Sequence, residues 1–274
     1  MEGHITRKRI RVNQQETDNQ HIDQHDPAPK MGWIDCHQHV IWGIDDGAAT
    51  EEMSHRMLQH AAEQGVYGIV CTSHASIDIQ PFHLNTYLQR LKSLQLWTKE
   101  HIPQLHLTQG AEIMWNDSIP RLLREGKLPS VNGYGYILIE YYPLTPWEEI
   151  VRSVKEIGSA GFFPLIAHVE RYKALRKKGR LKELKERYGV FAQMNSSTVL
   201  ASEKVGMFGD HWPKQMLDLG LIDVVASDAH NVDTRICRIK EAWLVLSQTY
   251  GEDAADHLCR ITPQQIWEGR LFSI

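Results

Sequence analysis

The sequence predicts an α/β fold in which parallel strands alternate with helices and close, or nearly close, into a barrel. Seven apolar runs of strand length recur along the chain, and segments with apolar residues at helical spacing lie between them. Such alternation is typical of a parallel sheet covered by helices, because parallel strands need crossover connections. Each run also ends at a residue that can bind a metal ion or lie beside one, and parallel barrel strands gather their C-terminal ends on one face. The glycine-rich dinucleotide fingerprint that an open sheet often carries is missing from the sequence.

The expected strands are these seven apolar runs. Nearly continuous apolar runs of four to eight residues are typical of strands that are buried on both faces. The runs cover residues 33–39, 67–74, 105–112, 136–140, 163–168, 190–196 and 222–230.

Helices are predicted between the runs from apolar spacing and from capping residues. Thr50 is the expected N-cap of the first helix, and Gly65 ends it. Pro146 stands where a first-turn proline belongs, and Gly161 ends that helix. The predicted helices cover residues 51–64, 85–101, 117–125, 146–160, 175–188, 211–220, 238–250, 253–260 and 263–269.

Length, charge and cysteine content limit the class of protein. A chain of 274 residues can form one large domain, which buries about three quarters of its unfolded surface. The net charge of −4 comes from 30 basic and 34 acidic residues that are mixed along the chain, so no basic stripe indicates a nucleic-acid partner. The four scattered cysteines are typical of a reduced protein, and no apolar stretch reaches the length of a membrane span. We expect a cytoplasmic protein without direct membrane insertion, and the sequence leaves a homo-oligomer open.

Residues 1–30 differ in composition from the rest of the chain. Ile5, Ile10, Val12 and Ile22 are the large aliphatic residues among mainly polar and charged neighbours. So little apolar surface cannot offset the entropy lost on ordering. We therefore predict a disordered N-terminal tail over residues 1–30 and a single domain over residues 31–274.

Imidazoles and carboxylates stand at the ends of the predicted strands. His37 and His39 are two apart on an extended chain, so both rings project to one side and form half of a divalent-metal site. Asp45 and Asp46 follow in a loop, where a turn is the alternative role for Asp45 and Asp46 is the better candidate ligand. The other candidates are His74, Glu112, Glu140, His168, Asp228 and His230. Together with His37, His39 and Asp46 they suffice for two or three hard or borderline divalent ions.

These residues also have ordinary structural alternatives. A histidine at the polar end of a strand can be a capping hydrogen-bond partner, and isolated glutamates are usually solvated. Two further histidines in register with the H-x-H pair make capping the weaker interpretation. The run before Glu140 is so apolar that this carboxylate must either emerge into solvent or bind a positive charge.

Eight short motifs carry a resemblance to a known family. They are His37-Gln-His39, Gly43-Ile-Asp-Asp46-Gly47, Thr72-Ser-His74, Gly110-Ala-Glu112, Ile139-Glu140, Ala167-His168-Val-Glu-Arg171-Tyr172, Asn195-Ser196 and Ser227-Asp228-Ala-His230-Asn231. The set resembles the PHP (polymerase and histidinol phosphatase) superfamily and, within it, the bacterial protein-tyrosine phosphatases of capsule and exopolysaccharide synthesis. The resemblance runs from about residue 31 to the C-terminus. It implies the PHP fold, a distorted (β/α)7 TIM-like barrel with metal ions at the C-terminal ends of the strands.

The resemblance further implies three metal ions, usually assigned as manganese, with iron or zinc as alternatives. By position, His37, His39, Glu112 and Asp228 would hold one ion. Glu112 would bridge to a second ion, held with Glu140 and His168, and Asp46, His74 and His230 would hold the third. The implied enzyme is a phosphoric monoester hydrolase that uses metal-activated water on phosphotyrosine. Its implied partner is the tyrosine-rich tail of a bacterial tyrosine autokinase.

Two arginines are candidates for binding the phosphate. Arg171 and Arg235 follow His168 and His230 on strand-end loops, where a guanidinium can hold an anion through two hydrogen bonds. In the family, arginines at these positions are thought to bind phosphate, and a surface salt bridge is the alternative for each. No cysteine is followed six residues later by arginine, so the loop of thiol phosphatases is absent from the sequence.

The chain departs from the family pattern beside the candidate ligands. Trp42 and Ala48 stand where relatives commonly have proline. The loop after His74 also lacks a second histidine or basic residue that is often seen there. We predict that Trp42 or Phe82 packs against the phosphotyrosine ring, with a core or surface role as the alternative for each.

Three other functions stay open at this point. A phosphoesterase of the same superfamily acting on a small molecule, such as histidinol phosphate, would share the metal ligands. An amidohydrolase also begins with H-x-H and ends with Asp, but it typically places a lysine between its metals. A non-catalytic metal-binding module that partners a kinase is the third alternative.

Overall fold

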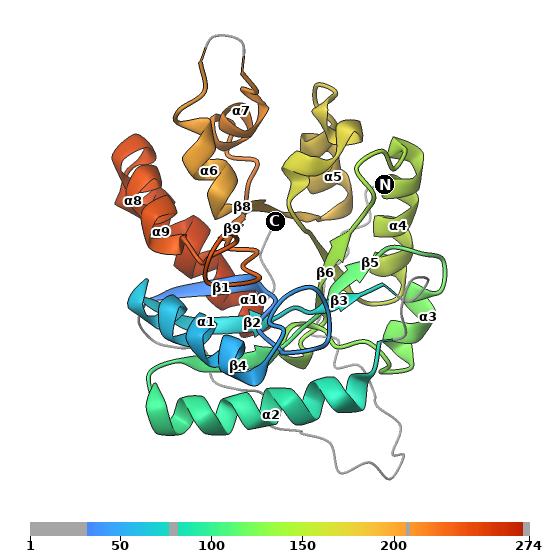
Figure 1. Cartoon of the computed structure of the whole chain (residues 1–274). Helices are drawn as coiled ribbons and strands as arrows, with labels where there is room; N and C mark the ends of the chain where they lie inside the picture. The colour runs from blue at the N-terminus through green and yellow to red at the C-terminus, as the bar shows by residue number, and fades with distance from the viewer. Residues whose placement is uncertain (1–31, 77–81, 207–208, 271–274) are drawn as a thin grey trace.

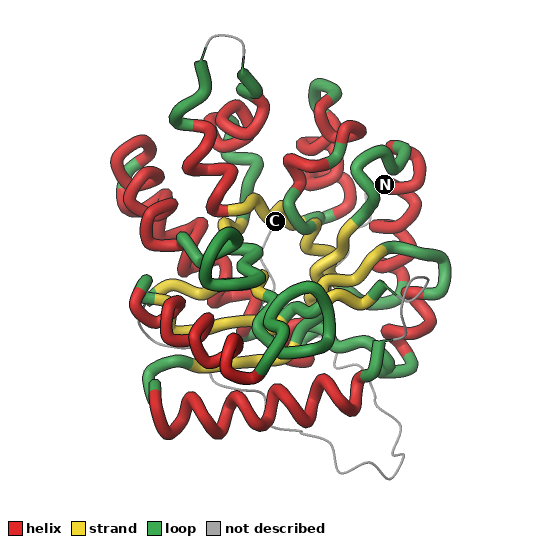
Figure 2. The backbone as a smooth tube through the Cα atoms, viewed as in Figure 1, coloured by secondary structure: helices red, strands yellow, loops and turns green. Residues whose placement is uncertain are grey.

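The computed structural model describes residues 32–76, 82–206 and 209–270. The tail predicted over residues 1–30 lies outside the described residues. Helices surround a curled sheet of parallel strands, and the strand ends surround a centre toward which their loops turn (Figures 1 and 2). None of the helices in the described part of the chain is both long enough and apolar enough to span a membrane.

The strands form two parallel sheets that continue into one another. One sheet has the order β1-β2-β4 and the other the order β3-β5-β6-β7-β8-β9. A bridge between Gln38 and Ala229 connects the end of β1 to the segment after β9. The strands are β1 (Trp33–Gln38), β2 (Val66–Cys71), β3 (His74–Ala75), β4 (His106–Gln109), β5 (Glu112–Met114), β6 (Tyr136–Glu140), β7 (Phe163–Ile166), β8 (Phe191–Asn195) and β9 (Val224–Ala226). All seven predicted runs therefore contain a strand, and the last residues of the second and third runs, His74 and Glu112, begin the further strands β3 and β5.

The helices follow the predicted order with local differences. The α-helices are α1 (Glu51–Glu63), α2 (Leu84–His101), α3 (Ile119–Arg124), α4 (Trp147–Ser159), α5 (Arg180–Tyr188), α6 (Ser196–Ser202), α7 (Trp212–Asp218), α8 (Ile239–Tyr250), α9 (Glu252–Asp256) and α10 (Thr262–Trp267). Short helices of other types are η1 (Val131–Gly133), η2 (Val169–Arg171), η3 (Lys173–Arg176) and the π-helical η4 (His257–Ile261).

Capping residues explain where several helices begin. The Thr50 hydroxyl accepts the backbone N–H of Met53 at 3.2 Å, as expected of the N-cap. Pro146, predicted to lie in the first turn, is instead the N-cap of α4, directly before the first helical residue. The helix predicted over residues 175–188 is divided, because Gly179 adopts a left-handed φ of 83° before α5. The sequence did not predict α6, which is too short and too rich in serine for a clear apolar pattern.

Two apolar clusters occupy the two faces of the sheet. The outer cluster lies between strands and helices and contains Ile137 and Ile139. The inner cluster contains Tyr136 and Leu138, because successive residues of a strand face opposite sides. Its other members are Ile34, Cys36, Val70, Val131, Leu165, Ala167, Val224, Ala226, Ile266 and Trp267. The strands thus enclose the inner cluster, which we call the apolar floor of the site, and the polar C-terminal residues of the strands lie beyond it.

Leu138→Ala should test the inner cluster, because the Leu138 side chain is 1% exposed at its centre. We expect a loss of about 2–5 kcal/mol in the free energy of unfolding, from lost burial and a residual cavity. Urea denaturation followed by circular dichroism measures it. Leu96→Ala is the matched control, since Leu96 is 58% exposed on α2. Equal unfolding midpoints for the two variants would contradict the enclosed floor.

Candidate metal centre

Four side chains converge at the end of β1. His37 Nε2 and His39 Nε2 lie 3.1 Å apart, so both rings face one point, as the H-x-H spacing predicts. Glu112 Oε2 lies 3.1 Å from the first nitrogen and 3.2 Å from the second. Asp228 Oδ1 lies 3.5 Å from both nitrogens. One atom from each of the four residues lies within 4.8 Å of the others, so the group could hold a metal ion.

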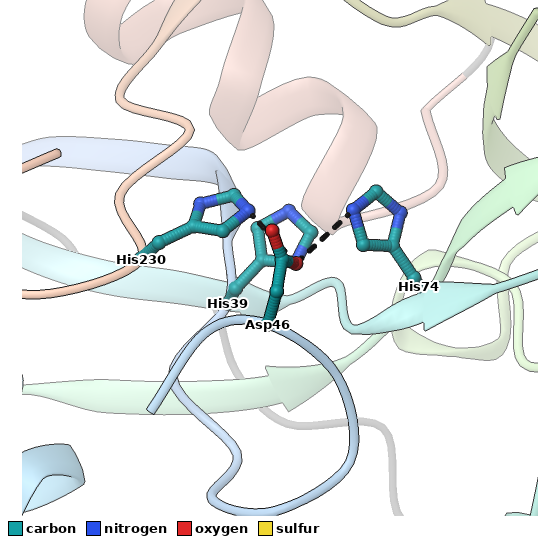
Figure 3. A group of neighbouring side chains, drawn as sticks. All are labelled: His39, Asp46, His74 and His230. Carbon is teal, nitrogen blue, oxygen red and sulfur yellow. Dashed lines mark ion pairs between the residues drawn. The ribbon is translucent and has the colours of Figure 1, made fainter. Parts of the chain in front are cut away.

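A second group shares His39 and lies nearer to solvent. Asp46 extends from the loop after β1 toward His74 and His230, with His39 behind it (Figure 3). Asp46 Oδ1 lies 3.5 Å from His74 Nε2 and 3.4 Å from His230 Nε2. The His39 and His230 rings are stacked with centroids 3.8 Å apart. His39, Asp46, His74 and His230 thus form a second set of possible ligands.

The third group contains the two glutamates. His74 Nδ1 lies 3.0 Å from Glu140 Oε1 and 3.2 Å from Glu112 Oε2, and these three residues could hold an ion. His168 Nε2 lies 2.6 Å from Glu112 Oε1 and 3.9 Å from Glu140 Oε2. All nine residues named from the sequence therefore lie in one continuous cluster.

The backbone at this centre is held in unusual conformations. His168 has a φ of 28° and Asp228 a φ of 54°, in the left-handed region that residues with side chains seldom adopt. Long-range hydrogen bonds fix both residues. The His168 N–H donates to Gln193 Oε1 at 2.7 Å, and the Asp228 N–H donates to the His37 carbonyl at 2.8 Å. A register shift in β1 between Asp35 and Gln38 further sets where the first histidine points.

The burial of these groups makes their charges interdependent. Burial opposes protonation of His39, yet hydrogen bonds to Asp228 and Asp45 raise its pKa well above the ordinary value. Burial likewise opposes ionisation of Asp228, but the nearby His37 charge holds the pKa of Asp228 well below its usual range. Burial and repulsion by His39 lower the pKa of His230 to about 4. Cations placed between these groups would satisfy the carboxylates without protons on the imidazoles.

The donor set fits divalent ions. His230 Nε2 is buried and has no hydrogen-bond partner among the described residues, although it faces the shared centre. A neutral imidazole nitrogen in this state is an available ligand atom. Mixed imidazole nitrogens and carboxylate oxygens suit manganese, iron or zinc.

Asp45 has a role that the sequence did not reveal. Its carboxylate accepts from His39 Nδ1 and from the His74 N–H, both at 2.8 Å, and from the Gly47 N–H at 3.0 Å. Although burial alone would raise it, the hydrogen bond from His39 lowers the pKa of Asp45 to about 2. Asp45 therefore makes the predicted turn and also fixes the His39 ring so that Nε2 faces the centre.

Both candidate arginines lie at the mouth of the cluster. Arg171 Nη2 lies 2.6 Å from Asp228 Oδ2, and Arg235 Nη2 lies 3.0 Å from Asp228 Oδ1. Their side chains remain 44% and 40% exposed, so each guanidinium borders both the ligand set and solvent. The salt-bridge alternative is present in the structure, but its partner belongs to the site and not to the outer surface.

The two candidate aromatic residues pack against the outer apolar cluster. Trp42 is half-buried, with the Arg90 guanidinium 5.4 Å from its ring centroid. Phe82 is half-buried, with its ring centroid 5.4 Å from that of Tyr87. The packing of either ring against phosphotyrosine stays a prediction.

Comparison with known proteins places these motifs in a family. Residues 33–268 match the family described as "Capsular polysaccharide synthesis, CpsB/CapC". The tyrosine-protein phosphatase CpsB of Streptococcus pneumoniae is 31% identical, with 85% of this chain and 97% of the relative covered. The tyrosine-protein phosphatase YwqE of Bacillus subtilis is 30% identical, with 80% of this chain and 86% of the relative covered.

A solved structure agrees with the sequence comparison. It comes from work on YwqE of Bacillus subtilis and CpsB of Streptococcus pneumoniae, described as unique metal-dependent tyrosine phosphatases. It superimposes with a TM-score of 0.76 at 28% identity and covers 88% of this chain and 96% of the solved chain. The fold is therefore shared over most of the chain. This protein belongs to the CpsB/CapC family of capsular polysaccharide synthesis.

Proposed function

We propose that this protein is a metal-dependent phosphatase that hydrolyses phosphotyrosine on proteins. The observation that carries the proposal is the convergence of four imidazoles and four carboxylates on three overlapping candidate metal sites. A fifth imidazole, that of His168, lies 2.6 Å from Glu112, and two arginines lie at the mouth of the cluster. Relatives named tyrosine-protein phosphatases, matched over at least 80% of this chain, support the same activity.

The proposed ligands all lie in this cluster, with His39 assigned to one ion and His168 taking the place of His74 in the third group. His37, His39, Glu112 and Asp228 would hold one ion, and Asp46, His74 and His230 would hold another. Glu112 would bridge to a third ion beside Glu140 and His168. When bound, divalent ions supply positive charge that neutralises phosphoryl oxygens and makes water more acidic. We propose manganese, with iron or zinc as the alternatives, in two or three sites.

Glu112 is suited to bridging because its two oxygens face different partners. Oε2 lies 3.1–3.2 Å from ring nitrogens of His37, His39 and His74, whereas Oε1 lies 2.6 Å from His168 Nε2. The side chain is 1% exposed, so solvent does not compete for either oxygen. Nearby histidine charges offset the burial that would otherwise raise its pKa, and they hold the pKa of Glu112 well below its usual range.

Arg171 and Arg235 would bind the phosphate from the solvent side. Each already approaches an anionic group at the centre, and a guanidinium matches the oxygen spacing of a phosphate. The leaving group of phosphotyrosine is a phenolate of pKa about 10, which needs less protonation than an alkoxide. Catalysis would therefore depend mainly on positioning and charge neutralisation.

A thiol mechanism is disfavoured by the positions of the cysteines. Cys36, Cys71, Cys237 and Cys259 are all buried. Burial raises the pKa of the Cys36 thiol, so its nucleophilic thiolate is scarce at neutral pH.

The proposal also includes a closed sheet and a location in the cytoplasm. We infer a closed, distorted (β/α)7 barrel, which the bridge between Gln38 and Ala229 supports. A single phosphatase domain over residues 31–274 in the cytoplasm, acting on a bacterial tyrosine kinase, is consistent with the family match over residues 33–268.

Metal dependence is tested by removing and restoring the ions. Treatment with a chelator should abolish turnover of p-nitrophenyl phosphate, and manganese should restore it, because the proposed nucleophile is water. Metal analysis should find about two to three ions per chain.

His39→Ala should reduce turnover by about a hundredfold or more, because His39 belongs to two ligand groups. His101→Ala, on the exposed end of α2, is the control. Full activity in metal-free protein would overturn the proposal.

The substrate class is tested with a panel at one metal concentration. A phosphotyrosine peptide should be turned over faster than a phosphoserine peptide of the same sequence, because the phenolate leaves more readily. Histidinol phosphate tests the small-molecule alternative. A preference for histidinol phosphate would indicate a small-molecule phosphatase. If no phosphate ester is turned over, the protein would instead be a non-catalytic metal-binding module.

The buried side-chain amides of Gln193 and Asn195 form hydrogen bonds with the proposed ligands. Gln193 Oε1 lies 3.2 Å from His37 Nδ1 and accepts the His168 N–H, while its Nε2 donates to Asn195 Oδ1 at 2.8 Å. Asn195 Nδ2 in turn donates to Asp228 Oδ2 at 2.8 Å. This chain of hydrogen bonds favours a proton on His37 Nδ1, which leaves Nε2 free to bind an ion. The sequence signal for it was weak, since Gln193 is only a polar residue within an apolar run.

Gln193→Leu should weaken metal binding by about ten- to a hundredfold, the usual effect of losing such a supporting group. Competition with a chelator measures the affinity without reference to turnover. Gln193→Glu should recover part of the loss, because it keeps an acceptor oxygen for His37. Gln215→Leu, at an exposed position on α7, is the control. If Gln193→Leu binds manganese as tightly as the parent, the amide pair does not position the ligands.

A further inference from the structure

Two segments leave the metal centre side by side. One follows Glu140 at the end of β6, and the other follows Arg171 at the end of η2. The Tyr141 N–H donates to the Tyr172 hydroxyl at 3.2 Å, and the Lys173 N–H donates to the Pro143 carbonyl at 3.0 Å. The β6–α4 connection and the segment before α5 are thus joined by hydrogen bonds, and we call the surface that they form the rim.

The first segment exposes two large apolar side chains. Tyr142 is 57% exposed and Leu144 is 70% exposed. The other large exposed apolar residues of the described chain, Leu96, Leu219 and Leu244, are each on or at the end of a different helix. Both residues closely follow the candidate ligand Glu140 in the chain, and exposed apolar side chains grouped in one segment can form a surface that contacts a partner.

The second segment carries a local excess of positive charge between Glu170 and Glu183. Residues 171–182 contain seven basic residues and no acidic residue, in a chain whose net charge is −4. Arg176 pairs with Asp210 at 2.7 Å. Lys173, Lys177 and Lys178 are exposed, and none of them has an ion pair with any residue that the structure describes. Such a local excess of lysine attracts anionic partners.

We propose that this rim, formed by Tyr142, Leu144, Lys173, Lys177 and Lys178, binds the peptide that flanks the phosphotyrosine and selects flanking acidic residues. The inference rests on the proposed phosphatase function and adds to it the kind of protein substrate. The positions support it, since Tyr142 lies two residues past Glu140 and Lys173 two residues past Arg171. A peptide whose phosphate lies at the metal centre can therefore reach the rim with its flanking residues. Its acidic side chains complement the lysines, and an apolar side chain can cover Leu144.

The test compares two phosphotyrosine peptides that differ only in flanking glutamate or glutamine, with p-nitrophenyl phosphate as a reference that has no flanking chain. The parent should show a KM roughly three- to tenfold lower for the glutamate peptide at low salt, as expected of exposed charge pairs. The preference should shrink in high salt, because ions screen exposed charges. K173Q/K177Q should remove the preference, and K173E/K177E should reverse it.

Matched variants separate rim contacts from general charge effects. K92Q/K99Q changes two exposed lysines on α2 and should keep the preference of the parent. L144A should raise the KM of both peptides relative to p-nitrophenyl phosphate, whereas L96A should not.

An unchanged glutamate preference in K173Q/K177Q would overturn the proposal. Lysine-dependent binding to anionic phosphatidylserine vesicles with unchanged peptide kinetics would overturn it in favour of a membrane surface. These results differ from failure of the proposed function itself, in which neither peptide nor p-nitrophenyl phosphate is turned over by the metal-loaded parent.

Discussion

The constraint on which the rest of the structure depends is the burial of many ionisable groups at one end of the curled sheet. A carboxylate that loses its hydration is costly unless a partner of opposite charge or several hydrogen bonds replace the water. Glu112 meets this requirement with imidazoles on both of its oxygens, and Asp228 meets it with two arginines and Asn195. Together these groups compensate one another's loss of hydration, whereas any one of them buried alone would destabilise the folded state.

The apolar floor and the polar centre depend on the same strands. Leu138 belongs to the inner cluster, and Glu140, two residues later, points to the same side at the strand end. In β9, Ala226 lies in the inner cluster just before the loop that carries Asp228. Because the strands are hydrogen-bonded in register, the packing of the floor also fixes the spacing of the groups above it. This rigidity suits a centre whose proposed ligands must converge to within a few ångströms.

The candidate metal centre and the rim lie on different kinds of structure. Most of the central groups stand at strand ends and are buried, although Asp46 lies on a loop and is 64% exposed. Leu144 and Lys173 lie in connections at the surface. Loops on a rigid scaffold can change without disturbing the core, which is why recognition commonly resides in them. Trp42 and Ala48, where the chain departs from the family pattern, also lie in such a connection, between β1 and α1.

The sequence by itself determined the α/β class and the group of candidate ligands. Both follow from local patterns: apolar runs alternate with helical spacing, and a polar residue ends each run. The H-x-H spacing even predicted that His37 and His39 face the same point. Only the tertiary structure decided how these groups combine. It showed that His39 belongs to two sets, that Asp45 holds His39, and that Gln193 connects His37 with His168. The separate strands β3 and β5, which begin where two predicted runs end, and the register shift in β1 also appear only in the tertiary structure. These features arise from contacts between residues far apart in sequence, and no pattern within a single segment records which distant partner will complete a hydrogen bond.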